Sequence, residues 1–175
     1  MTSLKLTRVE SGDPFEEHPL LKLIWPSPYR EIAQEAAAED IEAMRGGAKL
    51  GGVFLARLDG EVVGISGYFP LEESSVIGLR WHGVAQEHRG KGLSADILRL
   101  VLPEALSDFP DAEELMELAP ANEYGNAIAK HFKKLGFEAR GPQETYDWAE
   151  NAWQPYRLNI ATFMREPRPS RAPKM

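Results

Sequence analysis

The most informative part of the chain joins an expected strand to an amphipathic helix, and reads Val84-Ala85-Gln86-Glu87-His88-Arg89-Gly90-Lys91-Gly92-Leu93-Ser94. The first N–H groups of a helix point outward without an intrahelical partner, and the helix dipole adds partial positive charge there. Gly90 and Gly92 carry no side chain, so a phosphate group can approach the backbone closely. Arg89 and Lys91 add charge, and Ser94 adds a hydroxyl donor. The stretch therefore predicts an anion site, most simply for a pyrophosphate.

The segment before this turn predicts three antiparallel strands in succession, over 52–58, 61–69 and 76–85. Asp59-Gly60 joins the first two, and Asp-Gly between β-rich runs is the strongest short hairpin signal in a sequence. Period-two alternation over 4–9 predicts a further strand near the N-terminus.

The remaining periodicity predicts helices and strands on both sides of these runs. A helix starts at Asp13-Pro14 with Leu20, Leu21 and Ile24 on one face, and a longer helix runs over 29–44 and ends at Gly46-Gly47. The other expected elements are helices over 93–106 and 123–135, and strands over 114–118, 146–148 and 157–165. This order predicts an α/β protein of α+β character, with a twisted, mostly antiparallel mixed sheet flanked by helices.

Composition sets further limits on the class of protein. The 175 residues predict a single domain over 1–166, followed by a proline-rich, disordered tail over 167–175. With no cysteine, and with four histidines in no metal-binding spacing, we expect no metal site. A net charge of −7 argues against nucleic acid and acidic membranes as partners. No run approaches the roughly 20 apolar residues of a membrane span, which predicts a cytoplasmic protein.

Two other phosphate-binding motifs fit the turn less well. A P-loop would need glycine where Ala85 stands, and Ser or Thr after Lys91, where the sequence has Gly92. A dinucleotide-binding fingerprint matches formally, through Gly90, Gly92 and Ala95. It also requires a leading βαβ unit, whereas the runs before the turn predict antiparallel strands. A nicotinamide-binding enzyme is therefore kept as an alternative of lower rank.

A second segment supports a different comparison. It reads Asn122-Glu123-Tyr124-Gly125-Asn126-Ala127-Ile128 and continues, after two residues, as His131-Phe132-Lys133-Lys134-Leu135-Gly136-Phe137. Together with the turn, it resembles the GNAT superfamily of N-acetyltransferases, which has a similar glycine-rich turn and an "Asn … Tyr-x-Lys-Leu-Gly-Phe" segment. The order of elements is similar over nearly the whole chain. The resemblance implies the GNAT fold, acetyl-CoA as acyl donor and an amine as acceptor.

The resemblance also implies where acetyl-CoA would bind. The backbone of Val84 and Ala85 would pair with the pantetheine arm, and the N–H groups from Arg89 to Ser94, including Leu93, would hold the diphosphate. Asn122 or Asn126 would bond to the cofactor, and the two remain open because this segment is about three residues longer than usual. Phe132 stands where the family often has the tyrosine that protonates the departing thiolate. Phenylalanine cannot donate a proton, so Tyr124, His131, solvent or simple positioning would replace it.

His82 and Tyr124 are the candidate catalytic residues. A histidine suits proton removal from an amine near neutral pH, although packing near Trp81 is the commoner reason for a histidine in such a strand. Glu72 and Glu73 suit a cationic acceptor but are more simply a solvated loop. The resulting hypothesis is acetyl transfer to a primary amine of a small molecule or peptide by direct attack. The alternative is a catalytically silent acyl-CoA sensor, and a homodimer is the commonest assembly for either.

Overall fold

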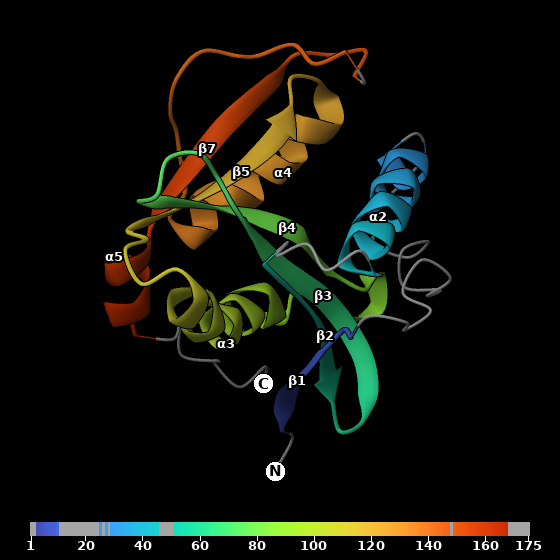
Figure 1. Cartoon of the computed structure of the whole chain (residues 1–175), viewed down its shortest axis with the longest axis vertical. Coiled ribbons are helices and arrows are strands. Elements are labelled where there is room, and N and C mark those ends of the chain that lie inside the picture. The colour runs from blue at the N-terminus through green and yellow to red at the C-terminus, as the bar shows by residue number, and fades with distance from the viewer. Residues whose placement is uncertain are drawn as a thin grey trace, which may run out of the picture. The chain divides into compact units, whose positions relative to one another are not determined.

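The computed structural model describes residues 3–10, 25, 27, 29–45, 51–147 and 149–167. The chain divides into two compact units, residues 1–112 and 113–175, each of which combines strands and helices (Figure 1). The described residues form seven strands interspersed with helices, in agreement with the predicted α/β class. Among these residues, no helix is long and apolar enough to cross a membrane.

The sheet of the first unit consists of four consecutive antiparallel strands. These are β1 (Leu4–Arg8), β2 (Gly52–Leu58), β3 (Glu61–Pro70) and β4 (Val76–Val84). The predicted hairpin between β2 and β3 is confirmed, because Asp59 and Gly60 both have positive φ, 52° and 93°. Positive φ at both central residues is the mark of the tight type I′ turn.

Two helices and a short 3-10 turn complete this unit. They are α2 (Tyr29–Arg45), η2 (Gln86–His88) and α3 (Leu93–Asp108), and Figure 1 draws α2 and α3 on either side of β3 and β4. The residues that α3 buries recur at helical spacing: Leu93, Ile97, Leu98, Val101, Leu102 and Ala105. A Cβ on Gly64 of β3 would lie 2.8 Å from the Ile97 side chain. Glycine at this position therefore lets α3 pack directly against the sheet.

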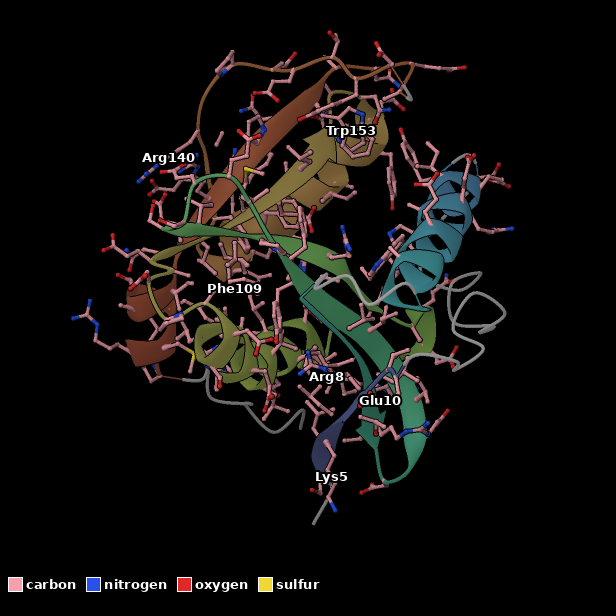
Figure 2. The ribbon with its side chains drawn as sticks, viewed as in Figure 1. Lys5, Arg8, Glu10, Phe109, Arg140 and Trp153 are labelled. Carbon is pink, nitrogen blue, oxygen red and sulfur yellow. The ribbon has the colours of Figure 1, made fainter. Side chains whose placement is uncertain are left out.

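The second unit contains β5 (Glu114–Pro120), α4 (Glu123–Leu135), β6 (Glu138–Ala139), β7 (Trp153–Asn159) and α5 (Ile160–Arg165). β7 pairs antiparallel with both β5 and β6. The Glu114 carboxylate accepts hydrogen bonds from Arg140 at 2.8 Å and Arg157 at 2.9 Å (Arg140 is labelled in Figure 2). These bonds link the start of β5 to β7 and to the residue that follows β6. The bounds of α4 agree with the prediction, and Gly136 ends the helix with φ of 97°.

One predicted strand is wrong over its second half. We expected a strand over 157–165, but β7 begins at Trp153 and the chain turns into α5 at Ile160. Asn159 caps the helix, because its side-chain oxygen accepts from the Thr162 N–H at 2.9 Å. Ile160 and Phe163 are both buried and lie three residues apart, on one face of a helix.

Other expectations differ or cannot be compared. Residues 146–147 form no strand; Glu144 instead makes an isolated bridge to Trp153, and the short strand β6 was not predicted. Trp148, the predicted helix from Asp13, the stop at Gly46-Gly47 and the tail after residue 167 lie outside the described residues.

Candidate active site

The end of β4 departs from regular strand geometry. The pairing of β3 with β4 shifts register between Ile65 and Gly67, so that Ser66 lies opposite a bulge in β4. Within this bulge, Trp81 has φ of 58°, which is uncommon for a bulky residue. The bulge re-aims the side chains that follow it, and His82 is the first of these.

The loop after β4 is held by its own basic side chains. The Arg89 guanidinium donates to the Val84 carbonyl at 3.0 Å, and the Lys91 ammonium donates to the Glu87 carbonyl at 3.1 Å. Ala85 is 1% exposed; its N–H donates to the Val63 carbonyl, and its own carbonyl accepts from the His88 N–H. Both backbone groups of Ala85 and the Val84 carbonyl are thus engaged inside the first unit, and the pairing of these two residues with a pantetheine arm stays a prediction.

The start of α3 has the geometry of an anion site. Gly90 and Gly92 have φ of 73° and 76°, and a Cβ on either would meet no atom within 4 Å. Gly92 is the N-cap residue and has no side chain to bond to the first-turn N–H groups. The helical ladder begins with the Asp96 N–H on the Gly92 carbonyl. Open space above an uncapped helix start is what an anionic group needs.

His82 lies between two serines of the first unit. Its Nδ1 is 2.9 Å from Ser66 Oγ, and its Nε2 is 2.7 Å from Ser94 Oγ. We expected the Ser94 hydroxyl to donate to the diphosphate, but in the structure it is hydrogen-bonded to the His82 imidazole. That His82 removes a proton from the acceptor stays a prediction.

In the second unit, the predicted asparagines occupy different places. Asn122 is the N-cap of α4 at the end of β5, and its Oδ1 accepts from the Gly125 N–H at 3.0 Å. Asn126 lies in the first turn and is exposed. A Cβ on Gly125 would lie 1.5 Å from the Pro120 carbonyl oxygen, so glycine is needed for this close approach of helix and strand. The contacts distinguish the two residues, and Asn122 is the one at the strand end.

Phe132 is a core residue of the second unit. It is 6% exposed, and its ring centroid lies 5.2 Å from that of Phe137 and 5.5 Å from that of Tyr156. Tyr124, the other candidate catalytic residue, is half-buried in the first turn of α4. The aromatic packing explains why a phenylalanine suits position 132, whatever the residue does toward a cofactor.

The sequence profile described as the acetyltransferase (GNAT) family matches residues 18–137, more than half of the chain. The protein belongs to the GNAT acetyltransferase family. The match spans the glycine turn and the α4 segment on which the predicted resemblance was based. A comparison with curated protein sequences gave no match.

Solved GNAT structures resemble the chain in fold at low sequence identity. A GNAT-family acetyltransferase from Desulfovibrio desulfuricans has a TM-score of 0.66 at 20% identity, over 90% of this chain and 99% of its own. One from Elizabethkingia anophelis with acetyl-CoA bound has a TM-score of 0.59 at 15% identity, over 90% and 98%. Spermidine N-acetyltransferase from Vibrio cholerae, as a mutant, has a TM-score of 0.63 at 12% identity, over 93% and 96%.

Sequence reasoning missed one titratable group of this GNAT protein. Glu117 lies on β5, three residues before the strand ends; the residue is half-buried, and desolvation of its carboxyl raises the pKa to about 8. A hydrogen bond from the Leu118 N–H at 2.9 Å opposes this shift in part. Glu117 pairs with Tyr156 across the β5–β7 ladder, and directly paired residues share a face of the sheet. The apolar run around Glu117 contained no signal of its burial.

A cluster of ionisable groups lies beside the loop after β4. His88 Nε2 is 3.7 Å from Glu61 Oε1 and 3.9 Å from Glu87 Oε1, and both ring nitrogens are buried without a hydrogen-bond partner. Such groups are the kinds of ligand that a divalent cation accepts, and they lie within 4.8 Å of one another. Both glutamate side chains are more than 60% exposed, so no ion is assigned here.

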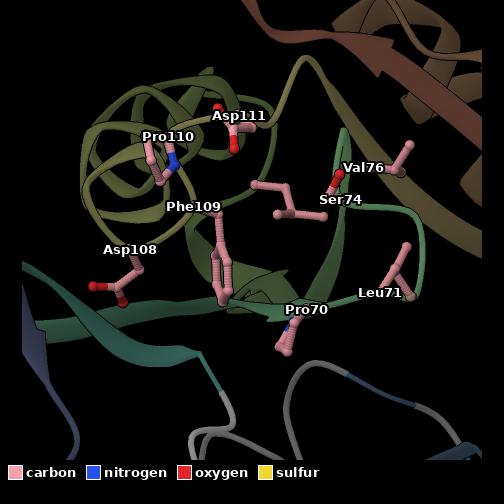
Figure 3. A pocket seen from close by; sticks show the side chains of 9 residues that line it. Pro70, Leu71, Ser74, Val76, Asp108, Phe109, Pro110 and Asp111 are labelled. Atoms are coloured by element: carbon pink, nitrogen blue, oxygen red, sulfur yellow. The ribbon is translucent and has the colours of Figure 1, made fainter.

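A hollow of about 340 Å³ lies at the opposite end of β4 (Figure 3). Leu71, Phe109, Asp108 and Asp111 are among its lining residues. The Glu72-Glu73 loop precedes β4 at this same end, whereas the glycine turn follows it. At roughly 3.3 Å per residue, the two ends of this strand are about 26 Å apart. Glu72 and Glu73 therefore lie far from the turn that would hold the diphosphate.

Proposed function

We propose that this protein transfers an acetyl group from acetyl-CoA to a primary amine. Family membership supports acetyl-CoA as the donor. The observation that carries the proposal is the start of α3, where the left-handed Gly90 and Gly92 leave open space above first-turn N–H groups that the cap residue does not bond. The 3′-phosphoadenosine diphosphate part of the donor is anionic, and its diphosphate suits this position.

Bound acetyl-CoA supplies a thioester, whose acyl carbon is attacked by the amine nitrogen while the C–S bond breaks. The residues of the chain would act mainly by binding and orientation. The Val84 backbone would pair with the pantetheine arm, and the turn from Arg89 to Ser94 would hold the diphosphate. Asn122, at the strand end, is our choice over the exposed Asn126 for a polar contact to the cofactor.

Protonation of the departing thiolate is assigned to Tyr124 or solvent, and water takes up the proton that the acceptor ammonium loses before it attacks. Tyr124 lies in the first turn of α4, whereas the ring of Phe132 is packed between Phe137 and Tyr156 and has no proton to give. Tyr124→Phe should lower kcat by about tenfold or more if the hydroxyl is the acid that protonates the thiolate. An unchanged kcat would assign this proton to solvent.

The acceptor is proposed to be cationic before it reacts. The net charge of −7 favours approach of an ammonium group. Several of the structural neighbours are named for spermidine, and polyamines therefore join the amines to be tested, along with lysine, amino acids and peptide N-termini. A single acyltransferase domain over 1–166, a cytoplasmic location and a homodimer remain parts of this proposal.

Release of CoA thiol provides a direct assay. The chain has no cysteine, so a thiol-reactive dye reads released CoA without background from the protein itself. We expect acetyl-CoA and CoA, but not NAD, to stabilise the fold, by about 2.7 kcal/mol at 100 times the dissociation constant. Stabilisation by CoA with no turnover on any amine would favour the sensor alternative. No stabilisation by any CoA species would contradict the proposal.

A matched pair of variants tests the position of the diphosphate. Gly92→Asn and Gly92→Asp have side chains of nearly equal shape, and both residues tolerate the left-handed conformation better than others. The carboxylate adds a negative charge where we place the phosphates, at a cost of about 1–4 kcal/mol at 4 Å. Gly92→Asp should therefore bind CoA at least about fivefold more weakly than Gly92→Asn. Equal affinities would place the diphosphate elsewhere.

A further inference from the structure

A line of three polar side chains crosses the first unit from β3 through β4 to α3. Ser66 Oγ lies 2.9 Å from His82 Nδ1, and Ser94 Oγ lies 2.7 Å from His82 Nε2. Ser66 is 0% exposed and Ser94 is 9% exposed, and these are the two buried polar residues among those that the structure describes. One imidazole thus bonds to both of them.

The β4 bulge makes this line possible. Because the β3–β4 register shifts between Ile65 and Gly67, Ser66 has no direct partner in β4 and faces its bulge, while it pairs with Phe54 of β2 on its other side. The positive φ of Trp81 turns the next side chain, His82, toward Ser66 and the start of α3. Strained backbone of this kind persists where surrounding contacts hold it in place, and the two serine hydroxyls supply such contacts here.

The chemistry of the imidazole matches its two neighbours. A neutral histidine has one N–H and one nitrogen lone pair, while each serine hydroxyl can donate or accept. Either tautomer of His82 is therefore satisfied by Ser66 and Ser94 together. For His82 to take a proton from a substrate amine, the serine hydroxyl that donates to its unprotonated nitrogen would first have to move away.

The far end of this line is part of the proposed diphosphate site. Ser94 is the second residue of α3, directly after Gly92 and Leu93, and its side chain is tied to the sheet through His82. We propose that His82 is a positioning residue: it holds the first turn of α3 against β4 so that the N–H groups of this turn meet the diphosphate. This role rests on the proposed function.

Three variants separate positioning from proton removal. Ser94→Ala leaves the imidazole in place but removes its link to α3. His82→Gln leaves an amide that reaches toward Ser94 but takes up no proton near neutral pH. His82→Ala removes both properties. Ser66→Ala removes the buried hydroxyl beside His82 Nδ1 and serves as a further test. Thermal unfolding checks that each variant folds.

If His82 is a positioning residue, Ser94→Ala and His82→Ala should each raise the Kd for CoA and the KM for acetyl-CoA by roughly 3- to 10-fold, with kcat within about twofold. The double variant Ser94→Ala/His82→Ala should have a Kd for CoA no higher than that of His82→Ala. His82→Gln should recover part of the affinity for CoA. The pH profile of kcat should keep its shape in His82→Gln.

Two results would overturn this inference. A loss of kcat by a factor of about 100 or more in His82→Gln, with a changed pH profile and an unaffected Ser94→Ala, would make His82 the base. Unchanged CoA affinity in Ser94→Ala and His82→Ala would remove the positioning role while leaving the acetyltransferase proposal intact. A wild-type protein that binds no CoA would instead refute the proposed function, and this role with it. Should His82→Ala fail to fold, His82→Gln and Ser94→Ala still decide between the outcomes.

Discussion

The substitution Glu117→Gln tests how burial controls a carboxyl group inside the second unit. Desolvation raises the pKa of the half-buried Glu117 from 4.5 to about 8. Each unit corresponds to 1.36 kcal/mol, so the full effect is about 5 kcal/mol. This is a large share of the 5–15 kcal/mol that typically stabilises a folded domain.

Proton linkage gives the direction in which stability changes with pH. The folded protein holds the Glu117 proton more tightly than the unfolded chain, so the associated stability is fully present below pH 4.5. It is lost as the pH rises through about 8. At pH 7 the loss amounts to about 3 kcal/mol. Glutamine has the same shape, can still accept from the Leu118 N–H, and has no proton to lose.

The assay is urea unfolding of both proteins at several pH values from 4.5 to 9. The free energy of unfolding of Glu117→Gln minus that of wild type should rise by about 1.4 kcal/mol per pH unit up to about pH 8 and then level off. Glu138→Gln, a change of an exposed carboxyl in the same unit, is the control and should show a much smaller dependence. A pH-independent difference for Glu117→Gln would refute the claim that this carboxyl is neutral at pH 7.

Three further substitutions test contacts of the second unit, each by urea unfolding. Gly125→Ala would bring a Cβ to 1.5 Å from the Pro120 carbonyl, and we expect a loss of about 2–3 kcal/mol; a loss below 1 kcal/mol would contradict the close packing. Glu114→Gln weakens the 2.9 Å ion pair with Arg157 and should cost about 1–2 kcal/mol, and a double-mutant cycle that shows no coupling would disprove the pair. Asn159→Ala removes the cap of α5 and should cost about 1 kcal/mol, whereas an unchanged midpoint would mean that the cap is not needed.

Local chemistry determined much of the fold in advance. The Asp59-Gly60 hairpin follows from two residues that tolerate positive φ, and the end of α4 follows from Gly136 in the left-handed region. The glycine turn before α3 could be identified as an anion site because its backbone geometry depends on Gly90 and Gly92 themselves. These features are encoded within a few residues of where they occur.

Prediction was poorer where local signals competed. The run over 157–165 combines β-rich and helical residues, and its division between β7 and α5 depends on the cap at Asn159 and on the burial of Ile160 and Phe163. Pairing of Trp153 with Glu144 and Pro120 likewise sets where β7 begins. Periodicity in a short window cannot weigh such distant contacts.

Local patterns in the sequence were enough to predict the order of the described elements from β1 to α4, the glycine turn and the family resemblance. Tertiary structure alone decided what surrounds the polar residues in these elements. His82 meets Ser66 and Ser94, which are 16 and 12 positions away in the chain, and Glu117 acquires its raised pKa from burial. A residue's pattern of neighbours along the chain shows which face it occupies, whereas its chemistry depends on what the fold brings against that face.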